Sequence, residues 1–221
     1  VTGKDPSRDG MEPTLSGAVA KVEKAVEDSK KGVDATATFA QAVEEMTTLL
    51  KKYPGEVGAR EARGRALWAM GDAEVRAGKD GGPTLDKAIE DLDEVARARP
   101  GDVQMLDTLV AAWMARGEAY TKAGADAGPA YQGAVAALDL ACTKSPGNMR
   151  LLLMRGKARR LLGDAKLAND FSGEALTRFQ EAVTDLSEVV KADHSNFAAV
   201  YQRGQALYGS AKAEAAKGQD P

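Results

Sequence analysis

Few residues of this chain have the types and spacing needed for catalysis or metal binding. His194 is the only histidine and Cys142 is the only cysteine. A metal cluster needs several ligands of this kind, and nucleophilic catalysis by cysteine needs a base held beside it. The sequence supports neither arrangement, and it predicts a protein without catalytic residues, metal or cofactor.

An acidic run at residues 90–94 could suggest metal binding or acid–base catalysis. On a helix, however, Glu90 and Asp91 point away from the apolar stripe that contains Ala88 and Leu92. We therefore expect the run to form a solvated face. The pair Gly81-Gly82 has neither the Lys-Ser/Thr ending nor the preceding strand of a phosphate-binding loop.

The elements that position these residues follow from a turn that recurs along the chain. Its proline position is occupied by Pro54, Pro100, Pro146 and finally His194, at spacings of 46, 46 and 48 residues. A fixed period of this size is typical of proteins built from stacked repeats. Proline at this position ends the preceding helix, because it cannot continue the hydrogen-bond ladder.

Each turn follows a helix with a regular apolar stripe. The stripe is centred on an alanine, namely Ala42, Ala88, Ala134 or Ala182. Large apolar residues lie three positions before it (Phe39, Leu85, Tyr131 and Phe179) and four positions after it (Met46, Leu92, Leu138 and Leu186). This spacing matches one face of an α-helix, and the small alanine lets a neighbouring helix approach closely.

A second kind of helix begins after each turn, with a capping residue available in Glu56, Asp102, Asn148 or Ser195. Three of the copies place a glycine in its interior, at Gly64, Gly156 and Gly204, and an arginine precedes each one. Because glycine in a helix costs about 1 kcal/mol relative to alanine, its recurrence indicates close contact between helices.

These features together resemble the tetratricopeptide repeat (TPR) family, whose pattern has glycines in the first helix, an alanine in the second and a proline in the turn. The resemblance covers residues 11–217, although the third copy has Val110 where a glycine is expected. It implies an all-α fold, an α-solenoid of antiparallel helix pairs that coils as a right-handed superhelix.

The copies are longer than the 34 residues of a usual TPR, by 12 residues or, in the last full copy, by 14. The surplus follows the first helix, where Gly78 and Gly124 suit a left-handed stop and Pro83 and Pro129 suit the next helix's first turn. We therefore expect first helices extended by about two turns, roughly 10 Å.

The predicted organisation is a flexible leader at residues 1–10 and a single solenoid at residues 11–221. Its repeats are expected at about 11–56, 57–102, 103–148 and 149–196, and a capping helix with a polar tail is expected at 197–217. The net charge of −3 and the isoelectric point near 5.4 give no reason to expect a nucleic-acid partner. No apolar run approaches the roughly 20 residues of a transmembrane helix.

The resemblance implies that the first helices line a concave groove. Its candidate residues are Glu61, Arg65, Asp107, Met114, Arg150, Lys157, Arg160, Tyr201, Gln205 and Tyr208. Glu61 and Arg65 stand where chaperone-binding members have lysine and asparagine, which disfavours a clamp for chaperone tails. Arg150, Lys157 and Arg160, beside the two tyrosines, either bind an acidic or aromatic extended segment or are ordinary solvated charges.

The favoured function is therefore a non-enzymatic interaction module or scaffold that binds a peptide or protein surface in this groove. The alternative is an exported or lipid-anchored envelope accessory protein for transport or complex assembly, suggested by the start at Val1 and the polar leader. The compartment, bacterial cytoplasm or periplasm and envelope, and self-association into a homo-oligomer are left open.

Overall fold

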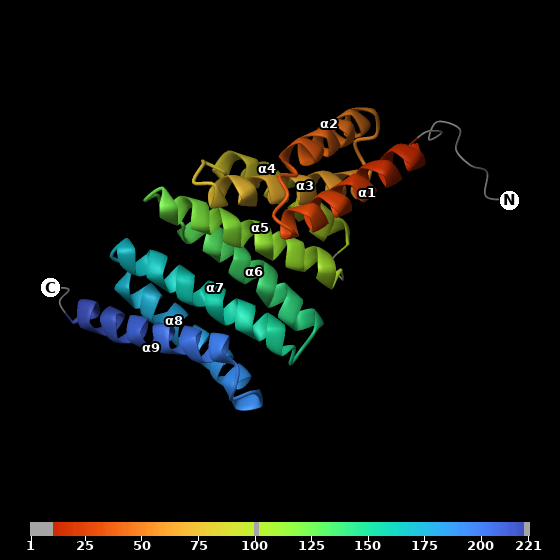
Figure 1. The fold of residues 1–221 in the computed structure, drawn as a ribbon. Coiled ribbons are helices and arrows are strands. Elements are labelled where there is room, and N and C mark those ends of the chain that lie inside the picture. Colours follow the sequence, from red (N-terminus) through yellow and green to blue (C-terminus); the bar gives the residue numbers. More distant parts are fainter. Residues whose placement is uncertain (1–10, 100–101, 219–221) are drawn as a thin grey trace. The chain divides into compact units, whose positions relative to one another are not determined.

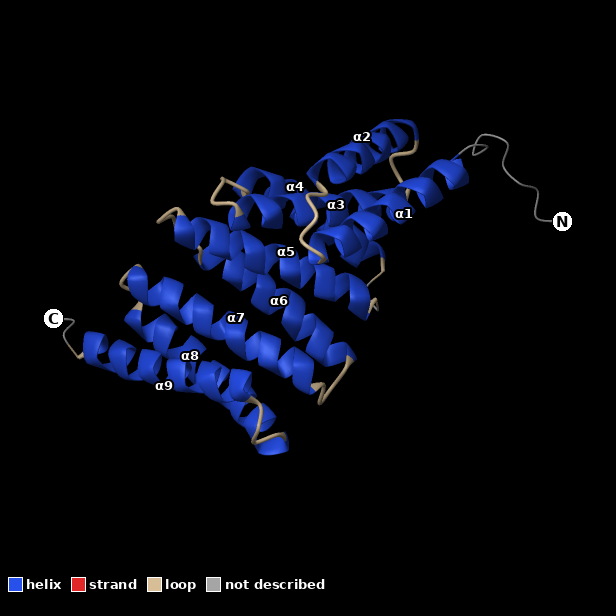
Figure 2. Cartoon of the chain, in the orientation of Figure 1, coloured by secondary structure: helices blue, strands red, loops and turns tan. Residues whose placement is uncertain are grey.

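The structure is a computed structural model that describes residues 11–99 and 102–218. All regular secondary structure in these two ranges is helical (Figure 2). The expected leader at residues 1–10 and the turn residues Pro100 and Gly101 lie outside the described residues.

The helices follow one another in pairs along the chain (Figure 1). Their bounds are α1 Met11–Lys30, α2 Thr36–Lys52, α3 Val57–Arg76, α4 Gly82–Ala98, α5 Val103–Lys122, α6 Gly128–Lys144, α7 Met149–Ala168, α8 Ser172–Ala192 and α9 Phe197–Lys217. The first helices α1, α3, α5 and α7 each have 20 residues. The all-α fold of paired, extended helices is therefore confirmed.

The chain divides into two compact units, Val1–Thr108 and Leu109–Pro221, with the boundary inside α5. In the first unit, α1 packs against α2 and α3, and α3 packs against α2 and α4. In the second unit, α7 packs against α6, α8 and α9, and α8 also packs against α9. The single continuous solenoid and its right-handed coil stay predictions.

The alanine stripe forms the core of both units, as its spacing predicts. Ala42 packs with Phe39 and Val22 in the first unit, and Ala182 packs with Leu186 and Ala206 in the second. The glycines of the first helices mark the closest crossings. A Cβ added at Gly64 would lie 2.8 Å from the Cγ of Leu92, and one at Gly156 would lie 2.5 Å from the Cγ of Leu186.

The loop inside each helix pair repeats in its backbone geometry. Its left-handed residues are Gly32 (φ 81°), Gly78 (φ 74°), Gly124 (φ 67°) and Asp170 (φ 62°). The predicted left-handed stops at Gly78 and Gly124 are thus confirmed. In the first three loops a carboxylate two positions later accepts a bond from a backbone N–H, as Asp80 does from Gly82 at 3.0 Å. The loop therefore sets where each second helix begins.

The N-caps of the first helices differ from the sequence expectation in two places. Asn148 caps α7 as expected, because its side chain accepts bonds from the backbone N–H groups of Arg150 and Leu151. Asn196, not Ser195, caps α9 by accepting from the backbone N–H of Ala199 at 3.0 Å. The Glu56 side chain makes no capping bond to α3. A carboxylate on a longer side chain is a weaker cap than asparagine.

Candidate functional site

The exposed groove candidates of the second unit lie on two neighbouring helices. Arg150 and Lys157 are exposed on α7, seven residues apart and therefore on one face. On α9, Tyr201 is 62% exposed, Tyr208 is 65% exposed and Gln205 is also exposed. These five exposed residues lie on two helices that pack against each other, and they are hereafter called the α7–α9 row.

Arg160, expected in the same groove, is engaged inside the unit. Its Nε donates to Oε1 of Gln202 at 2.7 Å, and its Nη1 pairs with Asp164 at 2.5 Å. The arginine side chain is only 14% exposed. Burial raises the pKa of Asp164, although the charges of Arg160 and Lys212 lower it. Arg160 thus joins α7 to α9 through Gln202, and it is not an exposed residue of the row.

The remaining candidates divide between the units. Glu61 lies in the first unit, where its carboxylate pairs with Nη1 of Arg99 at 2.7 Å. Arg65 and Asp107, also in the first unit, are half-buried, and so is Met114 in the second. The candidates of α7 and α9 therefore lie on two helices that pack against each other within the second unit, and the single groove that would unite all ten residues stays a prediction.

Two buried ion pairs escaped the sequence analysis. Asp91 is only 2% exposed and accepts two bonds of 2.7 Å from Nε and Nη2 of Arg63. Asp185 is 3% exposed and accepts bonds of 2.9 and 2.7 Å from the same atoms of Arg155. The expectation that Asp91 lies on a solvated face is wrong, because an arginine of the preceding helix satisfies its carboxylate where it is buried.

The pair around Asp185 extends into a network across three helices. Arg159 donates through Nη1 to Asp185 at 2.8 Å, and both Arg155 and Arg159 also pair with Asp139 of α6, at 3.0 and 3.1 Å. The Asp185 carboxylate raises the pKa of Arg155, so that its guanidinium stays charged. Arg63 reaches the preceding helix in the same way, through Thr47 of α2 at 3.4 Å.

The signal that could have revealed these pairs is their recurrence. Arg63 and Asp91 are 28 residues apart, and Arg155 and Asp185 are 30 residues apart. In the third copy the equivalent positions hold Leu109 and Ala137, so the arginine and the aspartate are replaced together. Their role is to fix one helix against its neighbours, and they offer no free group to a ligand.

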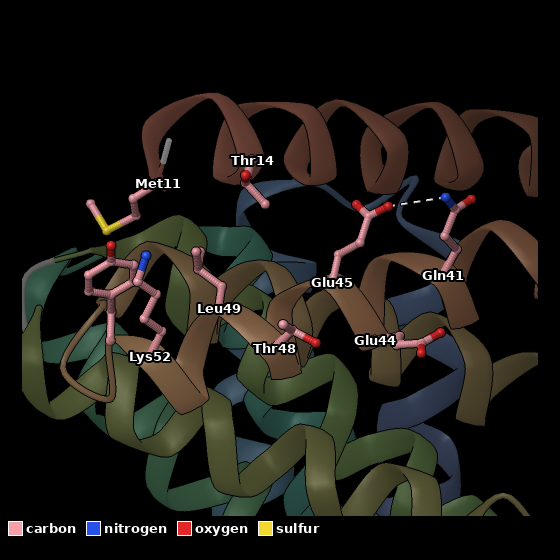
Figure 3. A pocket seen from close by; sticks show the side chains of 9 residues that line it. Met11, Thr14, Gln41, Glu44, Glu45, Thr48, Leu49 and Lys52 are labelled. Atoms are coloured by element: carbon pink, nitrogen blue, oxygen red, sulfur yellow. Dashed lines mark hydrogen bonds between the residues drawn. The ribbon is translucent and has the colours of Figure 1, made fainter. Parts of the chain in front are cut away.

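A hollow of about 560 Å³ lies between α1 and α2 in the first unit (Figure 3). Met11 and Thr14 of α1 line one side, and residues of α2 line the other. Its Glu45 accepts a bond from Gln41 at 3.1 Å and pairs with Lys21 at 2.5 Å. Within the described ranges, no group of three or more His, Cys, Asp or Glu side chains could hold a metal ion.

None of the helices described here has the length and apolar character needed to cross a bilayer. This finding agrees with the absence of a long apolar run from the sequence. On α9, the apolar side chains of Phe197 and Leu207 are exposed, as are the groove candidates Tyr201 and Tyr208.

No protein-family model and no curated protein sequence matches this chain. Among solved structures it is similar to a thermophilic TPR protein of Thermus thermophilus, with 14% identity, a TM-score of 0.38, and coverage of 86% of this chain and 99% of the other. A crystal structure of the MamA protein is 16% identical, with a TM-score of 0.40 and coverage of 93% of both chains. A de novo designed helical repeat protein is 13% identical, with a TM-score of 0.29 and coverage of 96% and 100%.

The packing itself identifies the fold. Consecutive helices pair within each unit, the alanine stripe lies in the contact, and glycines stand where the helices cross most closely. By these features the chain has a TPR-like helical-repeat fold.

Proposed function

We propose that this protein is a non-enzymatic interaction module that binds an acidic, aromatic-containing extended segment of a partner protein. The binding surface is the α7–α9 row. The observation that carries the proposal is the exposure of Tyr201 and Tyr208 on one face of α9, a helix that packs against α7, on which Lys157 is exposed.

Exposed tyrosines in a row are well suited to recognition. A tyrosine ring offers a large contact area with few rotatable bonds, and its hydroxyl can form a hydrogen bond at the edge of a contact. Tyr201 and Tyr208 are seven residues apart, which places both rings on the same side of the helix. Lys212 already lies over the Tyr208 ring, with its Nζ 5.7 Å from the ring centre.

The charges of the row favour an acidic segment. Arg150 and Lys157 are both exposed on α7, and Asp164, the carboxylate at the next seven-residue step along this face, pairs with Arg160. A partner carboxylate near Lys157 would gain a charge-assisted hydrogen bond, and a partner aromatic ring would stack against a tyrosine. The alternative of an envelope accessory protein for transport stays a prediction from the sequence.

The test is a titration of the full chain with fluorescent peptides that combine aspartate or glutamate with phenylalanine or tyrosine. We expect saturable binding that Lys157→Glu and Tyr208→Ala each weaken about tenfold, which corresponds to about 1.4 kcal/mol. The matched control is Lys191→Glu, the same charge reversal at an exposed position of α8. Equal losses for Lys157→Glu and Lys191→Glu would show that only net charge matters and would reject the row.

A further inference from the structure

The last described helix, α9, has the residue pattern of a first helix, but no second helix among the described residues covers it as α8 covers α7. Residues of α7 and α9 correspond at a spacing of 48, so that Gly204 of α9 is the equivalent of Gly156 of α7. A Cβ added at Gly156 would lie 2.5 Å from the Cγ of Leu186 of α8. A Cβ added at Gly204 would meet no atom within 4 Å.

The neighbouring apolar positions show the same difference. Leu152 of α7 is 7% exposed, whereas its equivalent Val200 of α9 is 40% exposed. Leu207, which takes the place of the half-buried Arg159, is 52% exposed. The side of α9 that corresponds to the α8-covered side of α7 is thus exposed and carries apolar side chains.

The charged residues show the same difference between α7 and α9. Arg155 of α7 forms two bonds with Asp185 of α8. Its equivalent in α9 is Arg203, for which the described part of the chain supplies no ion-pair partner. The guanidinium of Arg203 therefore stands where the guanidinium of Arg155 binds a carboxylate in α7, and it could bind a carboxylate of a docked helix.

We propose that the open face of α9, formed by Val200, Arg203, Gly204 and Leu207, docks an amphipathic helix of a partner. That helix carries an aspartate immediately before a leucine, as α8 carries Asp185 before Leu186. The leucine packs over Gly204 and the aspartate pairs with Arg203, in the geometry that α8 has on α7. Helices bind grooves in this way through a few anchors at helical spacing.

This face differs from the surface proposed above for an extended segment. At 100° per residue, the open face and the α9 part of the α7–α9 row are separated by roughly a third of a turn. The third side of α9 is buried against the rest of the unit through Ala199, Ala206, Gly209 and Ala213. The two proposals therefore concern different sides of one helix and can fail independently.

Charge complementarity favours a partner helix over a second copy of this chain. The open face contains a cation and no carboxylate. Two copies that paired symmetrically through it would place like charges within one small apolar contact, which is unfavourable. A helix with the Asp-Leu pair has the opposite charge and the complementary shape.

The chain itself supplies the probe, because α8 already binds an equivalent surface. A fluorescent peptide with the sequence of Ser172–Ala192, blocked at both ends, is titrated with the full chain and followed by anisotropy. We expect saturable binding. Asp185→Arg in the peptide, or Arg203→Asp in the protein, weakens it about tenfold, and the two changes together restore it.

Two further variants make the result specific. Gly204→Leu fills the open space and is expected to abolish binding, because the position does not contact the rest of the chain. Because the peptide is acidic and contains Phe179, Lys157→Glu distinguishes the two surfaces: unchanged peptide binding supports the open face, and weakened binding would assign the peptide to the α7–α9 row and overturn the proposal. Peptide binding that both charge reversals leave unaltered overturns the proposal, as does the absence of saturable binding. A dimer in light scattering that Gly204→Leu dissociates would assign the face to a second copy instead.

Discussion

The helix pairs α7–α8 and α5–α6 carry different residues at the same two equivalent positions. In α7–α8 these positions hold Arg155 and the 3%-exposed Asp185, joined by two hydrogen bonds. In α5–α6 the equivalent residues are Leu109 and Ala137, which are 4% and 8% exposed. The pair α3–α4 follows the charged solution, through Arg63 and Asp91.

This difference indicates that the arginine and the aspartate are present together or replaced together. A buried ion pair adds little net stability compared with apolar residues of similar volume, because desolvating both charges offsets their attraction. Removing only one partner is strongly destabilising, because it leaves a buried charge unsatisfied. In the pairs α3–α4, α5–α6 and α7–α8 the two positions hold either the arginine and the aspartate or two apolar residues.

The largest expected effect is that of Asp185→Ala. It removes the common partner of Arg155 and Arg159 and should lower the free energy of unfolding by about 3 kcal/mol, near the lower end for breaking a buried pair. The lower end applies because the two arginine side chains keep 19% and 15% exposure. Urea unfolding followed by circular dichroism measures it. Asp139→Ala, at a carboxylate that is 48% exposed, is the control, and a comparable loss there would contradict the assignment.

The next prediction extends the comparison to α9 and concerns the sign of an effect. Gly156→Ala should lower the free energy of unfolding by about 2 kcal/mol, as expected for an added methyl group in a packed contact, because Leu186 lies 2.5 Å from the new Cβ. Gly204→Ala should raise it by up to about 1 kcal/mol, since alanine is the better helix former and nothing obstructs it. Thermal unfolding of the two variants checks the signs, and equal shifts would show that α9 is covered.

A double-mutant cycle tests whether the two solutions are interchangeable. Arg63→Leu together with Asp91→Ala gives α3–α4 the residues of α5–α6. We expect the double variant to be about 1.5 kcal/mol more stable than the sum of the single losses implies, within the range for contacting residues. Urea titrations of all four proteins measure this coupling energy. Additive losses would mean that the two positions do not act together.

The smallest expected effect concerns the start of α9. Asn196→Ala should lower the free energy of unfolding by about 1 kcal/mol, the usual cost of losing a capping side chain, because Asn196 accepts the backbone N–H of Ala199. Ser195→Ala is the matched control and should change it by a few tenths of a kcal/mol, since Ser195 bonds only with the exposed Asp193. A larger loss for Ser195→Ala would reverse the cap assignment.

The amino-acid sequence by itself determined the helix pairs and their period. Helix bounds depend on local chemistry: proline stops a helix, left-handed glycine ends it, and the alanine stripe marks the side that is buried. Each of these signals acts within a few residues, so repetition along the chain reinforces it. The left-handed residues Gly78 and Gly124 illustrate this, and so does the cap at Asn148.

Only the tertiary structure decided which charged residues are buried and which apolar residues are exposed. Asp91 looks solvated by its own sequence neighbours, and it is buried because Arg63, 28 residues away, satisfies it. The sequence predicts Arg160 as a groove residue, but its Nε donates a hydrogen bond to Gln202 of α9. Leu207 carries the pattern of a covered residue, yet no described helix covers it. Burial depends on partners distant in sequence, and a local pattern contains no information about whether those partners are present.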